Sequence, residues 1–271
     1  MKHLQNQSFW RWAFCLAGAM LALPCVTLLA QPVPGGMGFV EKPKEPVKVG
    51  FEAAPDESLE YVVDAGSKRN EVVFVSRAPK ETIKGQTKKL SGHLSLNPHS
   101  IGEVKGVFEV DWNDLSTGKP IMDEHMRDEP WVNSKSHPKI VFNVTGFEAA
   151  EKQPEGGKVL KGKLIGTFAM NGRENPVQIP VTLAYVPGGE GKKGKKVKEA
   201  LGIKAAFSVA LADYGIKGKV MGDKKTVGTA VAEKQKITVS VFLARGADMP
   251  AKDTTKKASG KSKSKKKSNP A

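Results

Sequence analysis

Residues Leu160–Met170 (LKGKLIGTFAM) and Val177–Tyr185 (VQIPVTLAY) decide the fold. In each run, apolar side chains alternate with polar or small ones, a pattern that is typical of a β-strand with one buried face. The second run is the most regular and places Val177, Ile179, Val181, Leu183 and Tyr185 on one face. Because the connection between the two runs is short, we expect antiparallel neighbours.

The same alternation recurs along the chain and predicts eight or nine strands. A flat sheet of that size would leave unpaired edges, whereas closing it into a barrel removes them. An eight-stranded antiparallel β-barrel has an interior just wide enough for side chains or for one small ligand. We therefore predict an all-β barrel, with a two-sheet sandwich as the alternative. The remaining runs are Leu59–Asp64, Glu71–Arg77, Leu90–Leu96, Val104–Trp112, Ile140–Ala149, Ile203–Leu211 and Ile237–Leu243.

One segment departs from the alternation. Ile121–Val132 (IMDEHMRDEPWV) has helical spacing, with Met122 and Met126 four residues apart and Asp123 and Arg127 positioned to pair alongside them. Pro130 is expected to end the helix. The sequence thus predicts a short helix inserted between strands, where it could cap one end of the barrel.

The N-terminus is typical of a secretory signal peptide. Lys2 and Arg11 precede the apolar run Ala13–Leu23, and a cleavage site is expected after Ala30. The run is short for a membrane span of about 20 residues, although an uncleaved anchor is the alternative. Cys15 and Cys25 both lie in this segment, so the mature chain would hold no cysteine. We predict a signal peptide over residues 1–30 and a periplasmic or secreted protein.

The 271 residues carry 43 Lys and Arg against 28 Asp and Glu, a formal charge of +15. Residues 31–58 are predicted to be a flexible linker, 59–245 the barrel domain, and 246–271 a disordered Lys-rich tail with eight Lys and two Asp. Each Lys near an anionic membrane contributes about 1 kcal/mol. The tail could therefore bind an anionic membrane or envelope polymer, or it could only aid solubility. No aromatic residues interleave its lysines, so no nucleic-acid partner is expected.

No catalytic or metal-binding pattern stands out. The nucleophile motif G-x-S-x-G is absent. Gly189–Lys195 matches G-x-x-x-x-G-K, but Lys196 stands where a phosphate-binding loop needs Ser or Thr. The histidines show no metal-ligand spacing, and His125 is interpreted as tying the helix to the barrel. We predict a protein that is not an enzyme and holds neither metal nor cofactor.

Six short motifs in order resemble the YceI-like family of exported bacterial proteins that bind lipids or polyisoprenoids. They are Tyr61–Asp64, Gly85 with Gly92–Leu96, Val110–Arg127, His137–Phe142, Leu164–Val181 and Asp213–Ile216. The chain departs from the family pattern at Met122, at Arg173 and Glu174, and at Leu211 or Ala212, while the Lys192–Lys198 loop looks like an insertion. These departures leave the barrel expected and its ligand specificity open.

The resemblance implies a lipocalin-like barrel that holds a polyprenyl quinone, polyprenyl phosphate or similar lipid as cargo along its axis. The sequence leaves open whether the protein is a monomer or a dimer. The inward apolar face would then line a tunnel, with the helix as a lid. From the residues alone, a packed core is an equal alternative. In that case the protein would act at surfaces through its tail. The predicted tunnel lining is Phe74, Leu94, Phe108, Val110, Trp112, Met126, Trp131, Phe142, Val144, Phe168, Met170, Ile179, Val181, Phe207, Val209, Val239 and Val241.

Overall fold

A computed structural model describes residues 49–190, 196–221 and 224–246. The predicted signal peptide, the first part of the linker and the tail beyond Gly246 lie outside these residues. The strands are β1 (Leu59–Val63), β2 (Glu71–Arg77), β3 (Thr82–Thr87), β4 (Ser91–Leu96), β5 (Val104–Asp111), β6 (Lys139–Ala149), β7 (Val159–Met170), β8 (Arg173–Val186), β9 (Gly189–Glu190), β10 (Lys196–Val197), β11 (Ala200–Ala210), β12 (Val220–Met221), β13 (Lys224–Lys225) and β14 (Lys234–Arg245).

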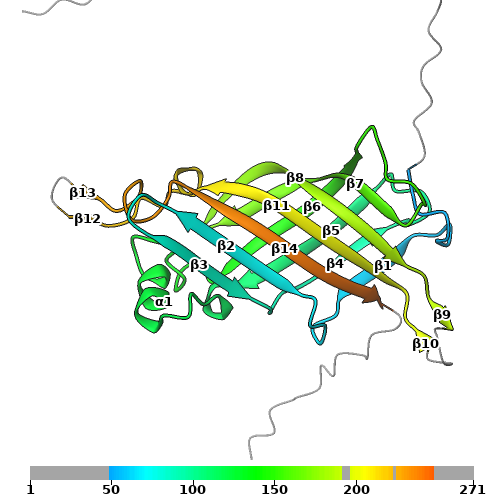
Figure 1. The fold of residues 1–271 in the computed structure, drawn as a ribbon, viewed down its shortest axis with the longest axis horizontal. Helices are drawn as coiled ribbons and strands as arrows, with labels where there is room; N and C mark the ends of the chain where they lie inside the picture. The colour runs from blue at the N-terminus through cyan, green and yellow to red at the C-terminus, as the bar shows by residue number, and fades with distance from the viewer. Residues whose placement is uncertain (1–48, 191–195, 222–223, 247–271) are drawn as a thin grey trace, which may run out of the picture. The chain divides into compact units, whose positions relative to one another are not determined.

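Eight strands close into an antiparallel barrel, which confirms the predicted fold class and not the sandwich (Figure 1). Their order around the ring is β1-β4-β5-β6-β7-β8-β11-β14, and β14 returns to pair with β1. β14 pairs with β1 through Leu243–Arg245 and with β2 through Gln235–Ser240. The β2–β3 hairpin therefore continues the wall where β1 ends.

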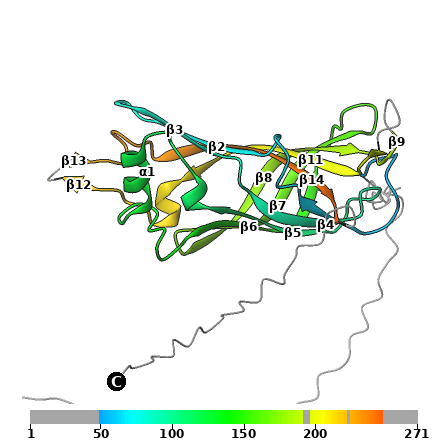
Figure 2. The ribbon, with the colours of Figure 1, turned by 90° about the horizontal axis from the view of Figure 1, so that it is seen from below.

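The short helices and the small hairpins lie at the two ends of the barrel (Figures 1 and 2). The helix α1 (Pro120–Arg127) and the β12–β13 hairpin lie at one end, which we call the α1 end, while the β9–β10 hairpin lies at the other. Two 3-10 helices, η1 (Trp112–Asp114) and η3 (Leu211–Tyr214), follow β5 and β11. None of the helices in the described ranges is both long and apolar enough to cross a membrane.

The helix prediction was right in place and wrong in length. α1 ends at Arg127 and is capped by Asp128, whose backbone N–H donates to the Glu124 carbonyl, so Asp128–Val132 form turns instead of helix. The predicted side-by-side pair of Asp123 and Arg127 is not an ion pair, because each side chain bonds to the segment that precedes α1.

At the end of the barrel away from α1, the interior is filled by packed side chains. Tyr61, Leu94, Leu96, Leu183, Leu201 and Leu243 are at most 1% exposed and fill the space between the strands. Phe51 is also fully buried and stacks on Tyr185, with 5.2 Å between ring centroids. Residues 49–58 therefore pack on the barrel, so this part of the predicted flexible linker belongs to the folded domain.

An ionic network closes the same end. The Tyr61 hydroxyl donates to Glu199 Oε1 at 2.6 Å, and Arg245 Nη1 donates to Glu199 Oε2 at 3.1 Å. Arg245 Nη2 reaches Glu57 Oε1 at 3.0 Å. Because Glu199 is buried, these bonds are needed to offset the loss of its hydration. The network joins β1, β14 and the residue just before β11 to the segment that precedes the barrel.

Candidate functional site

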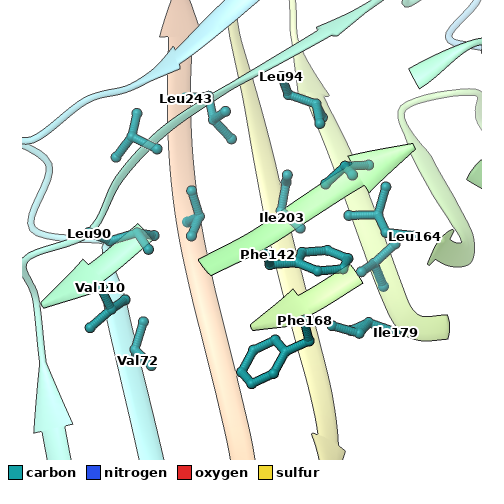
Figure 3. Packing of buried hydrophobic residues seen from close by; sticks show 14 of the residues in the cluster. Val72, Leu90, Leu94, Val110, Phe142, Leu164, Phe168, Ile179, Ile203 and Leu243 are labelled. Carbon is teal, nitrogen blue, oxygen red and sulfur yellow. The ribbon is translucent and has the colours of Figure 1, made fainter. Parts of the chain in front are cut away.

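The barrel encloses a cavity of about 380 Å³ toward the α1 end. This volume lies within the range of small-molecule sites, about 300 to 1,000 Å³. Inward side chains from β5, β6, β7, β8, β11 and β14 form nearly half of its wall. β2, β3, α1 and the segments that connect the strands supply the rest. Figure 3 shows side chains such as Phe142, Phe168, Ile179 and Ile203 projecting into the barrel interior. The period-two alternation places these residues on one face of their strands.

The wall is apolar in depth and polar at its rim. Its deep part includes Leu164, Ile179, Val181, Ile203 and Val241, which are all buried. The charged or ionisable members of the lining are Glu81, His125 and Lys219, and none of them is buried. The cavity therefore offers an apolar chain a dry environment and keeps charge near water.

The structure brings together around this cavity all of the predicted tunnel-lining residues except Leu94 and Val144. Leu94 and Val144 are the cross-strand partners of Gly106 on its two sides. Because Gly106 has no side chain, its neighbours can close over it, and both are buried in the core and not in the cavity wall. The cavity is thus confined to the α1 end of the barrel.

Sequence reasoning missed the part of the wall that comes from irregular segments. The long connection between β11 and β14 contributes Leu211, Ile216, Lys219, Thr226, Ala230 and Val231, and the neighbourhood of β3 contributes Glu81, Ile83 and Leu90. Ile83 is the only large apolar residue of β3 (TIKGQT), so alternation gave no signal there. Only the resemblance, through Gly85, pointed to a strand.

α1 is fixed beside the cavity by two side chains. Arg127 donates to three backbone carbonyl groups, those of Trp112, Asn113 and Leu115, at 3.4, 3.1 and 3.1 Å. Asp123 accepts from the Thr117 hydroxyl at 2.6 Å, from the Thr117 N–H at 2.7 Å and from Ser116 Oγ at 2.7 Å. These contacts attach the helix. His125, which was expected to do so, lies instead in the cavity lining.

Electrostatics favour the charged form of Asp123. Burial raises the pKa of its carboxyl group, but the hydrogen bonds from Thr117 and Ser116 and the nearby Arg127 outweigh burial, so the pKa lies below its usual value. The hydrogen bonds of Arg127 and Asp123 therefore both serve to hold α1 in place. The described residues contain no group of three or more His, Cys, Asp or Glu side chains that could hold a metal ion.

Comparison with known proteins agrees with this architecture. The family model of the YceI-like domain matches residues 61–243, which span the barrel from β1 to β14. The chain belongs to the YceI-like family. A UPF0312 protein of Vibrio cholerae is 24% identical over 166 residues, which cover 61% of this chain and 80% of that protein.

Among solved structures, that of BcnA supports the fold. Burkholderia cenocepacia BcnA is 17% identical with a TM-score of 0.50, and the match covers 66% of this chain and 98% of BcnA. A polyisoprenoid binding domain from Saccharophagus degradans is 13% identical with a TM-score of 0.49, covering 69% of this chain and 99% of that domain. At such identities the likeness concerns the barrel alone.

Proposed function

We propose that this YceI-like protein is a non-catalytic carrier or store for one long-chain isoprenoid or similar lipid, of the polyprenyl quinone or polyprenyl phosphate class. The observation that carries the proposal is the apolar cavity at the α1 end of a barrel whose other end is solid. The cavity would shield an apolar chain, and its polar rim would face the solvent or a membrane.

The physical driving force is burial of the chain. Each CH₂ group removed from water contributes about 0.8 kcal/mol, so a few isoprene units give micromolar or tighter binding before the costs of ordering. A protein interior is normally packed without voids. An apolar space of this size therefore suggests an occupant, and the resemblance read from the sequence implies the same ligand class.

The lining favours binding over chemistry. The ionisable side chains of the wall, Glu81, His125 and Lys219, all lie where water can reach them. Catalytic acids and bases usually act in a site from which water is excluded. We therefore propose a binding protein, exported to the periplasm or beyond by its N-terminal signal.

The test is native mass spectrometry of the protein purified from its own envelope, followed by organic extraction. We expect one polyprenyl or quinone-bearing lipid per chain. An unliganded mass that does not change after incubation with a panel of quinones and polyprenyl phosphates would overturn the proposal.

A second candidate function is binding to an anionic envelope surface through the tail, because residues 246–271 hold eight Lys and two Asp. Truncation after Ala251 separates the two candidates. If the tail acts alone, truncation abolishes binding to anionic vesicles while the full chain takes up no lipid. If the barrel is the carrier, uptake of an isoprenoid survives truncation.

A further inference from the structure

One residue of the cavity wall carries a buried hydrogen-bond donor without an acceptor. Trp112 lines the cavity and is 6% exposed, and its Nε1–H has no hydrogen-bond partner among the described residues. A buried indole N–H normally finds a partner, and one left unpaired is costly. Within the described part of the chain, it is the one side-chain nitrogen or oxygen atom that is fully buried and unpaired.

The backbone around Trp112 is held on both sides. Its N–H donates to the Pro138 carbonyl at 2.9 Å, and its carbonyl accepts from Arg127 Nε at 3.4 Å. Trp112 also begins η1, whose N-cap Asp111 accepts from the Asn113 N–H at 2.8 Å. These contacts fix the residue between β5 and α1, so a swing of the backbone to find another acceptor would break several bonds.

The other buried polar side chains of the wall are neutral and already engaged. Ser76 Oγ accepts from the Ala232 N–H at 2.8 Å, and Gln235 Nε2 donates to the Ala232 carbonyl at 2.6 Å. At the rim, Glu81 faces Lys119 at 3.7 Å. Arg127, which contacts the Trp112 carbonyl, already donates to three carbonyl groups. A charged head group placed beside Trp112 would therefore be buried without a free charged partner, which is strongly unfavourable. A neutral acceptor avoids this cost.

We propose that Trp112 Nε1–H donates a hydrogen bond to the head group of the lipid in the cavity, and that this head group is a neutral acceptor such as a carbonyl oxygen. This inference rests on the proposed carrier function and names the polar subsite of that same cavity. Met122 and Met126 line the cavity on the adjacent α1, and their flexible side chains can adjust to admit a head group. The head then lies inside the barrel and not at the rim.

The experiment measures binding of three probes with the same farnesyl chain to the full chain and to its variants. Farnesylacetone carries a neutral ketone, farnesene carries no polar group, and farnesyl monophosphate carries a charged one. We expect the ketone to bind most tightly. The W112F variant keeps an apolar ring and removes the donor, so it should weaken ketone binding about fivefold more than it weakens farnesene binding.

The matched control is W131F, because Trp131 also lines the cavity but has no unpaired buried N–H. This variant should not change the preference for ketone over hydrocarbon. Equal loss of ketone and farnesene binding in W112F, or tighter binding of the phosphate than of the ketone, would overturn the inference. Failure of all three probes to bind the full chain would instead overturn the carrier function itself.

A second measurement does not depend on a variant that folds. In ¹⁵N-labelled full chain, the indole N–H signal of Trp112 should move downfield when farnesylacetone binds and much less when farnesene binds. An indole signal that responds identically to both probes would contradict the proposed hydrogen bond.

Discussion

Asp123 shows how a single buried carboxylate holds the element beside the cavity. It accepts three hydrogen bonds from Ser116 and Thr117, and these bonds lower its pKa despite burial. We expect D123N to lower the free energy of unfolding by about 2 kcal/mol at neutral pH, because the amide accepts fewer and weaker bonds than the carboxylate. Urea unfolding of both proteins measures the difference.

The pH dependence of that difference follows from the sign of the shift. Because the folded-state pKa is lowered, the stabilisation is fully present above the unfolded value of about 4 and disappears as the pH falls through the lowered value. The gap between the wild type and D123N should therefore shrink below about pH 4. E124Q, which changes an exposed neighbour on α1, is the control and should show no comparable gap. A gap that is constant with pH would contradict this account.

The three tyrosines of the chain make a second prediction at this scale. Burial, followed by the charge of Glu199, raises the pKa of Tyr185 to about 12, and the pKa values of Tyr61 and Tyr214 are also raised. Ultraviolet titration should show no phenolate near pH 10, the usual value. The tyrosines therefore stabilise the fold below that pH, and this contribution disappears as the pH rises through the raised values.

E199Q separates the two causes for Tyr185. Removing the negative charge should lower the pKa of Tyr185 toward its usual value, while burial persists. E57Q is the control, because Glu57 touches the network only through Arg245 and is largely exposed. If E199Q left the phenolate titration unchanged, Glu199 would have no part in the shift.

At the scale of elements, a glycine in β5 allows neighbouring strands to close tightly. A Cβ atom at Gly106 would lie 2.3 Å from the His93 carbonyl oxygen and 2.9 Å from Leu94 Cα on β4. Both are backbone atoms and cannot move without disturbing the ladder. We expect G106A to lower the free energy of unfolding by about 2 kcal/mol. At Gly102 a Cβ would meet nothing within 4 Å, so G102A should leave the midpoint of thermal unfolding nearly unchanged.

The elements that sequence predicted best are those with one continuous buried face. β7 and β8 follow the alternation because the barrel interior demands an apolar residue at every second position. The alternation did not predict β3, because this strand is largely polar. β3 is held in place by its pairing with β2 and by the β-bridge between Gln86 and Ser116. Most of the candidate site came from the strands, whereas Ile216 and Val231 came from a connection with no periodic pattern.

At the scale of the whole barrel, one interior serves two purposes. Toward β9 and β10 it is filled by leucines and tyrosines that are essentially unexposed, and toward α1 it opens into the cavity. Both halves show the same alternation in the sequence, so this periodicity does not distinguish residues of the packed core from residues that line a cavity. The difference arises from which side chains meet across the barrel. Leu94 and Val144 pair with Gly106 on the two neighbouring strands and are buried outside the cavity wall.

A matched pair of variants, one in the filled half of the interior and one in the cavity wall, tests this division. Val181 lines the cavity at 5% exposure, and Val144 belongs to the filled half at 4% exposure. V181F places its ring in empty space, so we expect little loss of stability together with a large loss of isoprenoid uptake. V144F must force its ring into packed atoms and should cost about 1 to 3 kcal/mol. Denaturant unfolding and binding assays on both variants test the division. Equal destabilisation by the two substitutions would mean that the interior is packed throughout, and the carrier function would then lose its physical basis.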